Sequence, residues 1–530
     1  GTMKKLLILL MGIAVAMSAF GNAQGETGAA AADLPTLTIL NGTEPPSLDS
    51  SLMSDTTSSR IHQALFETLI SYNPETNLGE PGVAESWTVS DDGKVYTFKL
   101  RKTNWSDGVP ITAQTVVDSW LRTLDPATGS SYAWMMTMVV AGSGDYNSGD
   151  AGPQAVKIKA VDDYTFQVEL PSPAAYFIGM LPHQIFGILP LHTIEEHGDE
   201  WTLPGNIVSN GPFLLEEWKP QEVLTVVKNP EYWDADMVQL GKIVFIPSDD
   251  DNTRLNMYLN GEADWMRGGM PPDQLPTLMQ REDFEIIPAL GTYYYAMNQT
   301  EPPFDDPNLR KALAMSIDKQ VLVDKVSRGG QLPADSVVPI LGGYTPPTGN
   351  GFNVEKAKEY LAKAGFPNGE GFPEVTLLYN TSEGHRVIAE YVQQQWETNL
   401  NVTFGIENTE WKTVLARGKE QDFQIMRLGW IGDYQDPNTF LELFYSFSGQ
   451  NYGKYASTEF DELVAAAALL PDGPARNAKL LEAETIFIEE DQGIIPIYFY
   501  ANHDLIDTDI WGGWYPTTMG NHPFKYIYKK

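Results

Sequence analysis

The chain contains no cysteine among its 530 residues. Without thiols there is no disulfide bond and no thiol catalysis. An exported chain also cannot begin with the cysteine that carries a lipid anchor. A protein of this length can bury a core that is large enough to need no disulfides.

Basic residues are scarce relative to acidic ones. Lys and Arg number 35 and Asp and Glu number 70, which gives a formal net charge of -35. Binding to nucleic acid requires a basic footprint, so we expect no nucleic-acid partner. The acids are scattered along the chain, and we interpret most of them as solvated surface.

Long apolar runs are missing except near the N-terminus. The two residues before Met3 are interpreted as a cloning remnant. Lys4 and Lys5 precede an apolar segment, residues 6–20, and small residues follow it up to Ala23. The segment is too short for a comfortable membrane span. This arrangement predicts a secretory signal peptide.

The start of the mature chain follows from this interpretation. We expect residues 1–23 to comprise the cloning remnant and the signal peptide, with cleavage after Ala23. Residues 24–33 are small and polar, which is typical of a disordered N-terminus. Because no cysteine could carry a lipid anchor, the predicted location is the periplasm.

Motifs for catalysis are also missing. The sequence contains no Gly-x-Ser-x-Gly elbow, no P-loop and no His-Glu-x-x-His zinc motif. His192 and His197 are wrongly spaced for one helical face and are interpreted as surface residues. Residues 247–252 could suggest a cation site, but a turn and helix N-cap is the alternative that we favour. Paired carboxylates for glycoside cleavage could lie anywhere among the acids. We therefore expect no enzyme, no cofactor and no metal site.

Short β-type runs alternate with helical patterns along the rest of the chain. Residues 94–100 alternate apolar and polar positions, as a half-buried strand does, and residues 156–170 and 213–228 each predict a hairpin. Helical spacing covers residues 112–124 and 306–326. Mixed elements without a long linker indicate an α/β protein of several closely packed lobes.

Four stretches of sequence resemble one protein family. They are residues 82–120, 207–233, 293–319 and 408–444. In their order along the chain and in their residues, they are similar to the periplasmic oligopeptide-binding proteins of ABC importers, in solute-binding protein family 5. The resemblance runs from about Leu34 to the C-terminus.

The resemblance implies a periplasmic-binding-protein, or Venus-flytrap, fold with mixed sheets and hinge strands. Two main lobes and a small extra lobe would close over an extended ligand. Lobe I would combine residues 34–66, 188–290 and 498–530. Lobe II, the small one, would be residues 67–187, and lobe III would be residues 291–497.

The resemblance also implies a function. The protein would be a monomer that captures short peptides of about three to five residues and delivers them to the transmembrane permease subunits of an ABC transporter. One alternative is the same fold with an oligosaccharide, haem or metal chelate as ligand. Another is a hydrolase or a chaperone.

Asp433, in the stretch GWIGDYQDP, is the central predicted site residue. In the resembling proteins this acid pairs with the α-amino group of the ligand. An enclosed carboxylate would recognise any peptide without reading its side chains, provided that the attraction exceeds the desolvation cost. The alternative is that Asp433 caps the turn before Asp436 and Pro437.

The main chain of the ligand is expected to pair as an added strand. The resemblance assigns one edge to Gly429, Trp430 and Ile431, and the other edge to the tripeptide of Ser54, Asp55 and Thr56. Asp55 is offset by one position from an acid common in the family, so this contact departs from the family pattern.

The ligand carboxylate requires a cation. By resemblance Arg427 would serve ligands of about three residues and His385 those of about four. Ser327, beside Arg328, stands where the family has the lysine that serves dipeptides. We therefore predict that the protein binds tripeptides to pentapeptides in preference to dipeptides. The alternatives are a structural ion pair for Arg427 and a helix-start role for His385.

Aromatic residues are predicted to line the side-chain pockets. Trp411 and Trp430 would form pocket walls, and Tyr132, Tyr294 and Tyr500 match tyrosines that line the cleft in the resembling proteins. For each of them the alternative is packing in the core or at the rim.

Overall fold

The structure is a computed structural model that describes residues 34–174, 176–341, 343–470 and 473–530. The predicted signal peptide and the predicted disordered segment, residues 1–33, lie outside the described residues. Among the described residues, no helix is both long enough and apolar enough to cross a membrane.

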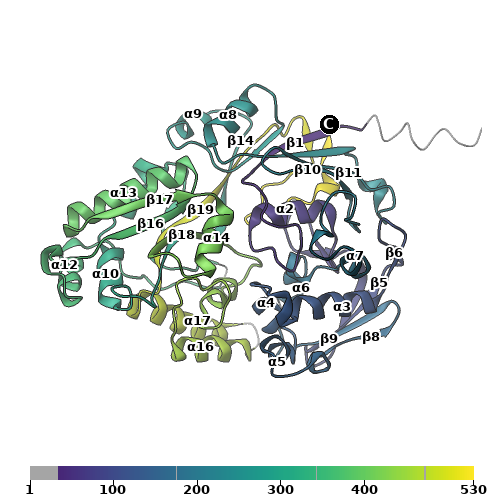
Figure 1. The fold of residues 1–530 in the computed structure, drawn as a ribbon, viewed down its shortest axis with the longest axis horizontal. Helices are drawn as coiled ribbons and strands as arrows, with labels where there is room; N and C mark the ends of the chain where they lie inside the picture. Colours follow the sequence, from purple (N-terminus) through teal and green to yellow (C-terminus); the bar gives the residue numbers. More distant parts are fainter. Residues whose placement is uncertain (1–33, 175, 342, 471–472) are drawn as a thin grey trace, which may run out of the picture.

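An eleven-stranded mixed sheet runs through the molecule. One half consists of β10 (Phe213–Lys219), β11 (Val223–Lys228), β12 (Lys242–Pro247), β1 (Thr36–Gly42) and β13 (Trp265–Arg267), in that order. β10 and β11 form the predicted antiparallel hairpin, and β1 is parallel to both β12 and β13. This half is coloured purple to teal on the right of Figure 1.

The other half of the sheet contains β18 (Ile425–Ile431), β16 (Val375–Asn380) and β17 (Phe404–Thr409), with the short β15 (Leu332–Pro333) at the side. β16 is parallel to both of its neighbours. The sheet order and the helices between these strands confirm the mixed α/β class.

Two long strands connect the halves. β14 (Phe284–Met297) and β19 (Ile495–Ile506) are antiparallel partners that run from the group around β1 to the group around β16 (Figure 1). Their register shifts between Pro288 and Thr292. The predicted lobe boundaries, at residues 290/291 and 497/498, fall inside these two strands, and the division into lobes stays a prediction.

A separate four-stranded sheet lies within residues 67–187. Its order is β4 (Ala84–Val89), β5 (Val95–Leu100), β9 (Thr165–Glu169) and β8 (Ile158–Asp162), and β8 with β9 forms the second predicted hairpin. Helix α3 (Ala113–Leu124) packs against it. Thr112 caps α3 with a capping box, and the buried indole of Trp120 donates a hydrogen bond to the carbonyl of Phe186 at 3.2 Å.

The remaining elements cover these sheets or connect them. The longer helices are α2 (Thr56–Leu65), α8 (Asp251–Leu259), α12 (Val354–Lys363), α13 (Glu383–Leu400), α14 (Trp411–Lys419), α16 (Thr458–Ala468) and α17 (Pro474–Thr485). The shorter ones are α4 (Trp134–Thr137), α5 (Ser143–Ser148), α6 (Phe177–Met180), α7 (Leu191–His197), α9 (Leu275–Leu278) and α15 (Asn438–Leu441). Three two-stranded pairs are β2 (Ile70–Tyr72) with β3 (Gly79–Pro81), β6 (Thr103–Asn104) with β7 (Pro110–Ile111), and β20 (Trp511–Gly512) with β21 (Tyr528–Lys529).

Two local predictions have different outcomes. Asp250 caps α8, so the interpretation of residues 247–252 as a turn and N-cap is confirmed. A single helix over residues 306–326 is wrong, because α10 (Pro307–Met315) ends before α11 (Lys319–Val321) and its π-helical continuation. The Ser316 hydroxyl donates to a main-chain carbonyl and Asp318 caps the next turn, so polar side chains interrupt an otherwise helical pattern.

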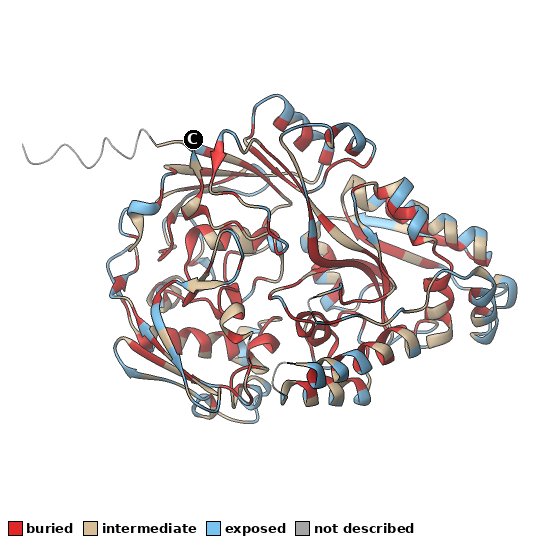
Figure 2. Cartoon of the chain, turned by 180° about the vertical axis from the view of Figure 1, so that it is seen from behind, coloured by how far each residue is buried: buried red, intermediate tan, exposed pale blue. Residues whose placement is uncertain are grey.

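The interior is continuous along the central strands, which Figure 2 shows as largely buried. Trp396, on α13, is fully buried, its ring lies 4.2 Å from that of Phe404, and its indole donates to the carbonyl of Leu313 at 3.1 Å.

We predict that Trp396→Ala lowers the free energy of unfolding by about 3–5 kcal/mol, because the substitution leaves a cavity. Leu469→Ala, at a residue that is 66% exposed, should change it by less than about 0.5 kcal/mol. Urea unfolding would measure both, and equal effects would contradict the packing described.

Candidate functional site

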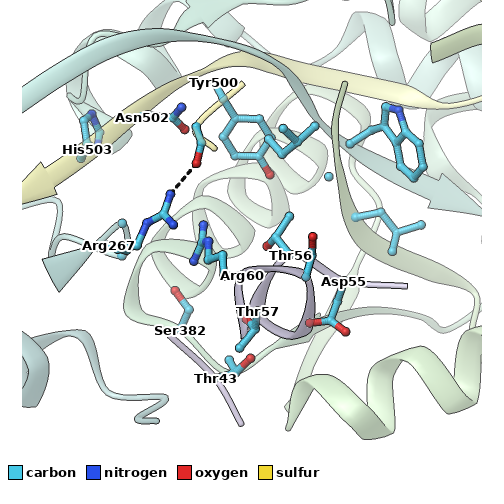
Figure 3. Close-up of a pocket in the computed structure, with 18 of the residues that line it drawn as sticks. Thr43, Asp55, Thr56, Thr57, Arg60, Arg267, Ser382, Tyr500, Asn502 and His503 are labelled. Carbon is cyan, nitrogen blue, oxygen red and sulfur yellow. Dashed lines mark hydrogen bonds between the residues drawn. The ribbon is translucent and has the colours of Figure 1, made fainter. Parts of the chain in front are cut away.

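A cavity of about 460 Å³ lies between the two halves of the molecule. Its wall is formed by α2 and the segment before it, by β13, β18 and β19, and by the start of α13 (Figure 3). All the residues predicted for the site line this one cavity: Ser54, Asp55, Thr56, Tyr132, Tyr294, His385, Trp411, Arg427, Gly429, Trp430, Ile431, Asp433 and Tyr500. Their individual roles stay predictions.

Asp433 faces across the cavity. Its Oδ2 accepts a hydrogen bond of 2.8 Å from the Tyr132 hydroxyl, and its Oδ1 lies 3.2 Å from Nε2 of His183. The side chain is 14% exposed, and its own N–H donates to the Thr439 hydroxyl at 2.9 Å. The carboxylate of Asp436 accepts from the N–H of the turn instead. Capping of this turn by the Asp433 side chain is therefore not what the structure shows.

The two acids of this turn have different partners. Arg476 donates to both carboxylate oxygens of Asp436, at 2.8 and 2.7 Å, and the pair is largely buried. Among the described residues, no lysine or arginine forms a salt bridge with Asp433. Asp436 thus fixes the turn, while the negative charge of Asp433 remains available to the cavity.

The strand that leads to Asp433 has one unpaired edge. β14 pairs with β18 along its whole length, from Met297 with Ile425 to Gly291 with Ile431. On the other edge, β16 pairs only with Ile425 and Met426. Within the described residues, the rest of that edge has no strand partner, so an extended ligand could add to it.

The alternation of an antiparallel ladder indicates which residues face this edge. The N–H of Gly432 donates to the carbonyl of Leu290, and the neighbouring pair of Thr292 and Trp430 keeps the same register. By this alternation the main chain of Trp430 points toward β14, and the main-chain groups of Gly429 and Ile431 point toward the cavity.

A glycine is required on the cavity edge because Tyr500 lies against it. A Cβ at Gly429 would overlap the hydroxyl of Tyr500. That hydroxyl accepts a hydrogen bond of 2.6 Å from Arg427. The missing side chain therefore leaves room for the Tyr500 side chain, which comes from β19, to reach β18 and to hold the guanidinium of Arg427 beside the strand.

Arg427 is a buried cation without a carboxylate partner among the described residues. It is 8% exposed, donates to Oδ1 of Asn380 at 3.1 Å, and lies 4.5 Å from the ring centroid of Tyr293. Its Nε has no hydrogen-bond partner in the described part of the chain. The structural ion pair considered from the sequence is not formed, and the free donor suits an anionic ligand group.

His385 lies near Arg427 but is uncharged. Burial, and next the charge of Arg427, hold the pKa of His385 well below its usual value. Its Nδ1 is 3.2 Å from the Tyr293 hydroxyl. His385 lies in the first turn of α13, and the side chain of Ser382 caps this helix by accepting a hydrogen bond from the His385 N–H. As a neutral imidazole it can offer a hydrogen bond to a carboxylate, but no charge.

The segment before α2 uses its acid locally. Oδ1 of Asp55 accepts from the N–H of Ser58 at 2.9 Å and caps α2, and burial raises the pKa of this carboxyl. The Asp55 side chain is thus engaged in its own helix.

Apart from Tyr500, the predicted aromatic residues divide into three that pack in the wall and one that is half-buried. Trp430 stacks on Tyr132 with a 5.9 Å centroid separation, and its indole donates to the carbonyl of Thr439 at 2.7 Å. Tyr294 is buried on β14, whereas Trp411 is half-buried at the start of α14. The first three stiffen the wall by packing, and Trp411 keeps part of its surface toward the cavity.

Sequence patterns did not mark several residues that line the cavity. His183 contacts Asp433 from a segment far away in the chain, and Arg60, Arg267, Asp504 and His522 also contribute to the wall. None belongs to a motif or a charge cluster, since each reaches the cavity only through the fold.

Two sheet halves joined by a pair of long strands, with an acid, a cation and an open strand edge in the cavity between them, define a two-lobed ligand-binding protein. The family model of bacterial extracellular solute-binding proteins, family 5, matches residues 79–452. The chain belongs to this family, which confirms the resemblance seen in the sequence. Proteins of this family bind substrates for transport.

Known proteins resemble the chain over nearly its whole length. The periplasmic oligopeptide-binding protein OppA of Salmonella typhimurium is 35% identical over 97% of this chain and 95% of its own. The solved structure of OppAIV from Borrelia burgdorferi has a TM-score of 0.91, 37% identity, and coverage of 94% and 100%. Haemophilus influenzae OppA in complex with the peptide RPPGFSPFR has a TM-score of 0.90, 31% identity, and coverage of 94% and 99%.

The two halves of the molecule are placed as they are in a ligand-bound relative. The unliganded open form of the murein tripeptide-binding protein MppA, which is 33% identical, gives a TM-score of only 0.62 over 94% of this chain and 98% of its own. The peptide complex above gives 0.90. The relative placement of the lobes therefore matches a ligand-bound relative more closely than an open one.

We predict that His385 makes the protein less stable in acid. Because the folded-state pKa lies below the unfolded value near 6.5, the unfolded chain binds more protons below pH 6.5, and stability falls as pH falls. Between pH 6.5 and 5.0 this contribution is roughly 2 kcal/mol. Urea unfolding of the wild type and of His385→Gln at both pH values would show a smaller loss for the variant. Equal losses would contradict the buried neutral state.

Proposed function

We propose that this protein captures short peptides of about three to five residues in the cleft and delivers them to an ABC transporter permease. The observation that carries the proposal is Asp433, an enclosed carboxylate that faces the cavity without a lysine or arginine partner among the described residues. Relatives whose names describe oligopeptide binding support the choice of ligand class.

The amino end of the peptide would bind Asp433. Hydrogen bonds from Tyr132, and the nearby His183, hold the carboxylate in one orientation. A primary ammonium brings three donors and a full positive charge, and in a closed cleft their attraction to the acid is stronger than in water. This contact depends on no side chain of the ligand.

The main chain of the peptide would add to β18. The cavity edge of β18 carries the outward main-chain groups of Gly429 and Ile431, and Ser54 to Thr56 lie in the wall formed by the start of α2. Main-chain hydrogen bonds are common to all peptides, so they give affinity without sequence preference.

The carboxylate of a tripeptide would bind Arg427, whose Nε is unpartnered within the described residues. His385, uncharged and next to it, would donate a hydrogen bond to slightly longer ligands. Ser327 hydrogen-bonds Gln331 at 3.0 Å and offers no cation to a dipeptide.

We also propose where the protein acts and which partner it meets. The mature protein would act as a monomer in the periplasm after cleavage behind Ala23, with no catalytic activity, and would dock to transmembrane permease subunits. The periplasmic location is supported by relatives named as periplasmic proteins.

Asp433→Asn should weaken the binding of trialanine by about 100-fold, because the variant keeps the shape and loses the charge that pairs with the ammonium. Isothermal titration calorimetry would measure this. Asp199→Asn, at an exposed acid outside the cavity, serves as the matched control and should leave the affinity unchanged. N-acetyl-trialanine should bind the wild type weakly and should lose little in the variant. Unchanged trialanine affinity in Asp433→Asn would refute the anchor and would favour a ligand without an amine, such as an oligosaccharide.

Ligand length should follow the positions of the cations. We expect trialanine and tetraalanine to bind at least about tenfold more tightly than dialanine, because Ser327 stands where the resembling proteins have the lysine that serves the carboxylate of a dipeptide. A titration series from two to nine alanines would test this, since one relative holds a nine-residue peptide. Dialanine binding that equals or exceeds trialanine binding would contradict the assignment.

A further inference from the structure

Two arginines line the cavity without a role in the contacts proposed so far. Arg60 projects from α2 one turn beyond Thr56, and Arg267 is the last residue of β13. Figure 3 shows both guanidinium groups in the same part of the pocket, below Asn502 and Tyr500 of β19. Arg267 lies in the half of the sheet that is opposite β18, and the helix that carries Arg60 packs against β10 of that half.

Most donors of the two guanidinium groups have no partner in the described structure. A guanidinium carries five N–H donors. Within the described part of the chain, Arg60 makes one hydrogen bond, a long one of 3.4 Å to the carbonyl of Asn41. Arg267 is 7% exposed, donates to the carbonyl of Gly520 at 2.7 Å, and lies over the ring of Trp265. Its Nε has no partner among the described residues.

The two positive charges are close enough to repel each other. Burial is the main reason that the pKa of Arg60 falls to about 9, and the charge of Arg267 lowers it further. His503 and His522, also in this wall, have lowered pKa values because they are buried, and His522 lacks a hydrogen bond at both ring nitrogens among the described residues. They add no charge.

Acids nearby compensate only part of this charge. The charge of Asp504 raises the pKa of both arginines. Among the described residues, however, Asp504 forms no salt bridge within 4.0 Å with either of them. Asp251 is paired with Arg254. The charge of Asp55 also raises the pKa of Arg60, but the Oδ1 of this acid is engaged in capping α2. Among the described residues, neither Arg60 nor Arg267 therefore has a carboxylate within 4.0 Å, and both guanidinium groups can accept one from a ligand.

We propose that Arg60 and Arg267 together bind a second carboxylate of the ligand, so that the cleft prefers acidic peptides. The inference rests on the proposed function. The carboxylate could belong to an Asp or Glu side chain, or to the chain end of a longer peptide. Side chains of a ligand strand alternate between its two faces, so one residue in two can point away from the lobe of Arg427. A guanidinium pair matches the two oxygens of a carboxylate in geometry and charge.

The first experiment compares matched tripeptides by isothermal titration calorimetry. Trialanine variants with Glu at position one, two or three are each paired with the Gln peptide. In the wild type, at least one Glu peptide should bind about tenfold more tightly than its Gln match. Arg60→Gln and Arg267→Gln should abolish that preference and still bind the Gln peptide. Arg60→Lys should restore part of it, which a purely structural role would not do.

The control removes a positive charge elsewhere. Lys356→Gln, on the exposed side of α12, should leave the preference unchanged. Binding of the Gln peptide and a thermal melting curve for each variant show that it is folded. A second arm uses pentaalanine with a free or amidated chain end. If the site takes the chain end, amidation should weaken wild-type binding about tenfold and leave Arg60→Gln unaffected.

The outcomes separate the two levels of inference. Equal binding of every Glu and Gln pair by the wild type, together with an amidation effect that is the same in Arg60→Gln, would overturn the second carboxylate site and leave peptide capture intact. Failure of the wild type to bind any of the peptides would instead overturn the proposed function. A Glu preference that Arg60→Gln retains would assign the preference to other residues and refute this proposal.

Discussion

The cleft depends on a carboxylate that is enclosed but not neutralised. The turn after β18 contains two acids, and the fold treats them differently. Asp436 is bound by Arg476, which fixes the turn, while the carboxylate of Asp433 has the Tyr132 hydroxyl and His183 as its side-chain partners among the described residues. An isolated buried carboxylate is costly, and a cationic ligand group removes that cost. The turn itself thus supports the proposed contact between Asp433 and a positively charged ligand end.

A single strand places most of the other recognition groups relative to that acid. β18 carries Arg427 near its middle, the glycine edge after it, and Asp433 two residues beyond its end. Because a strand has a fixed rise per residue, the separation of the acid and the cation is set by sequence spacing. The close approach of Tyr500 to Gly429 then places its hydroxyl where Arg427 donates to it, which holds the guanidinium in position. In the proposed binding mode, ligand length would follow from the backbone more than from the pocket walls.

The sequence predicted which residues line the cavity better than it predicted their charges and contacts. The long ordered resemblance located Asp433, Arg427 and the aromatic residues, because these positions belong to recognisable stretches. It could not show that His385 is uncharged, since its pKa depends on burial and on Arg427. It also missed His183 and Arg60, which reach the cavity from distant segments. Periodicity found both hairpins, but it ran through Asp318, where a side-chain cap begins a new helical turn.

Closure of the lobes and binding of the ligand are coupled through the same carboxylate. Tyr132 and His183 belong to the segment 67–187 and Asp433 to the segment 291–497, so their contacts join two segments that the sequence predicts to lie in different lobes, and separation of those lobes would break them. Closing without a ligand would bury the Asp433 carboxylate with the Tyr132 hydroxyl and His183 as its neighbours, at a cost in desolvation. A ligand ammonium adds the missing charge to contacts that are already formed. The difference between these two closed states is the free energy by which a ligand can shift the hinge equilibrium toward closure.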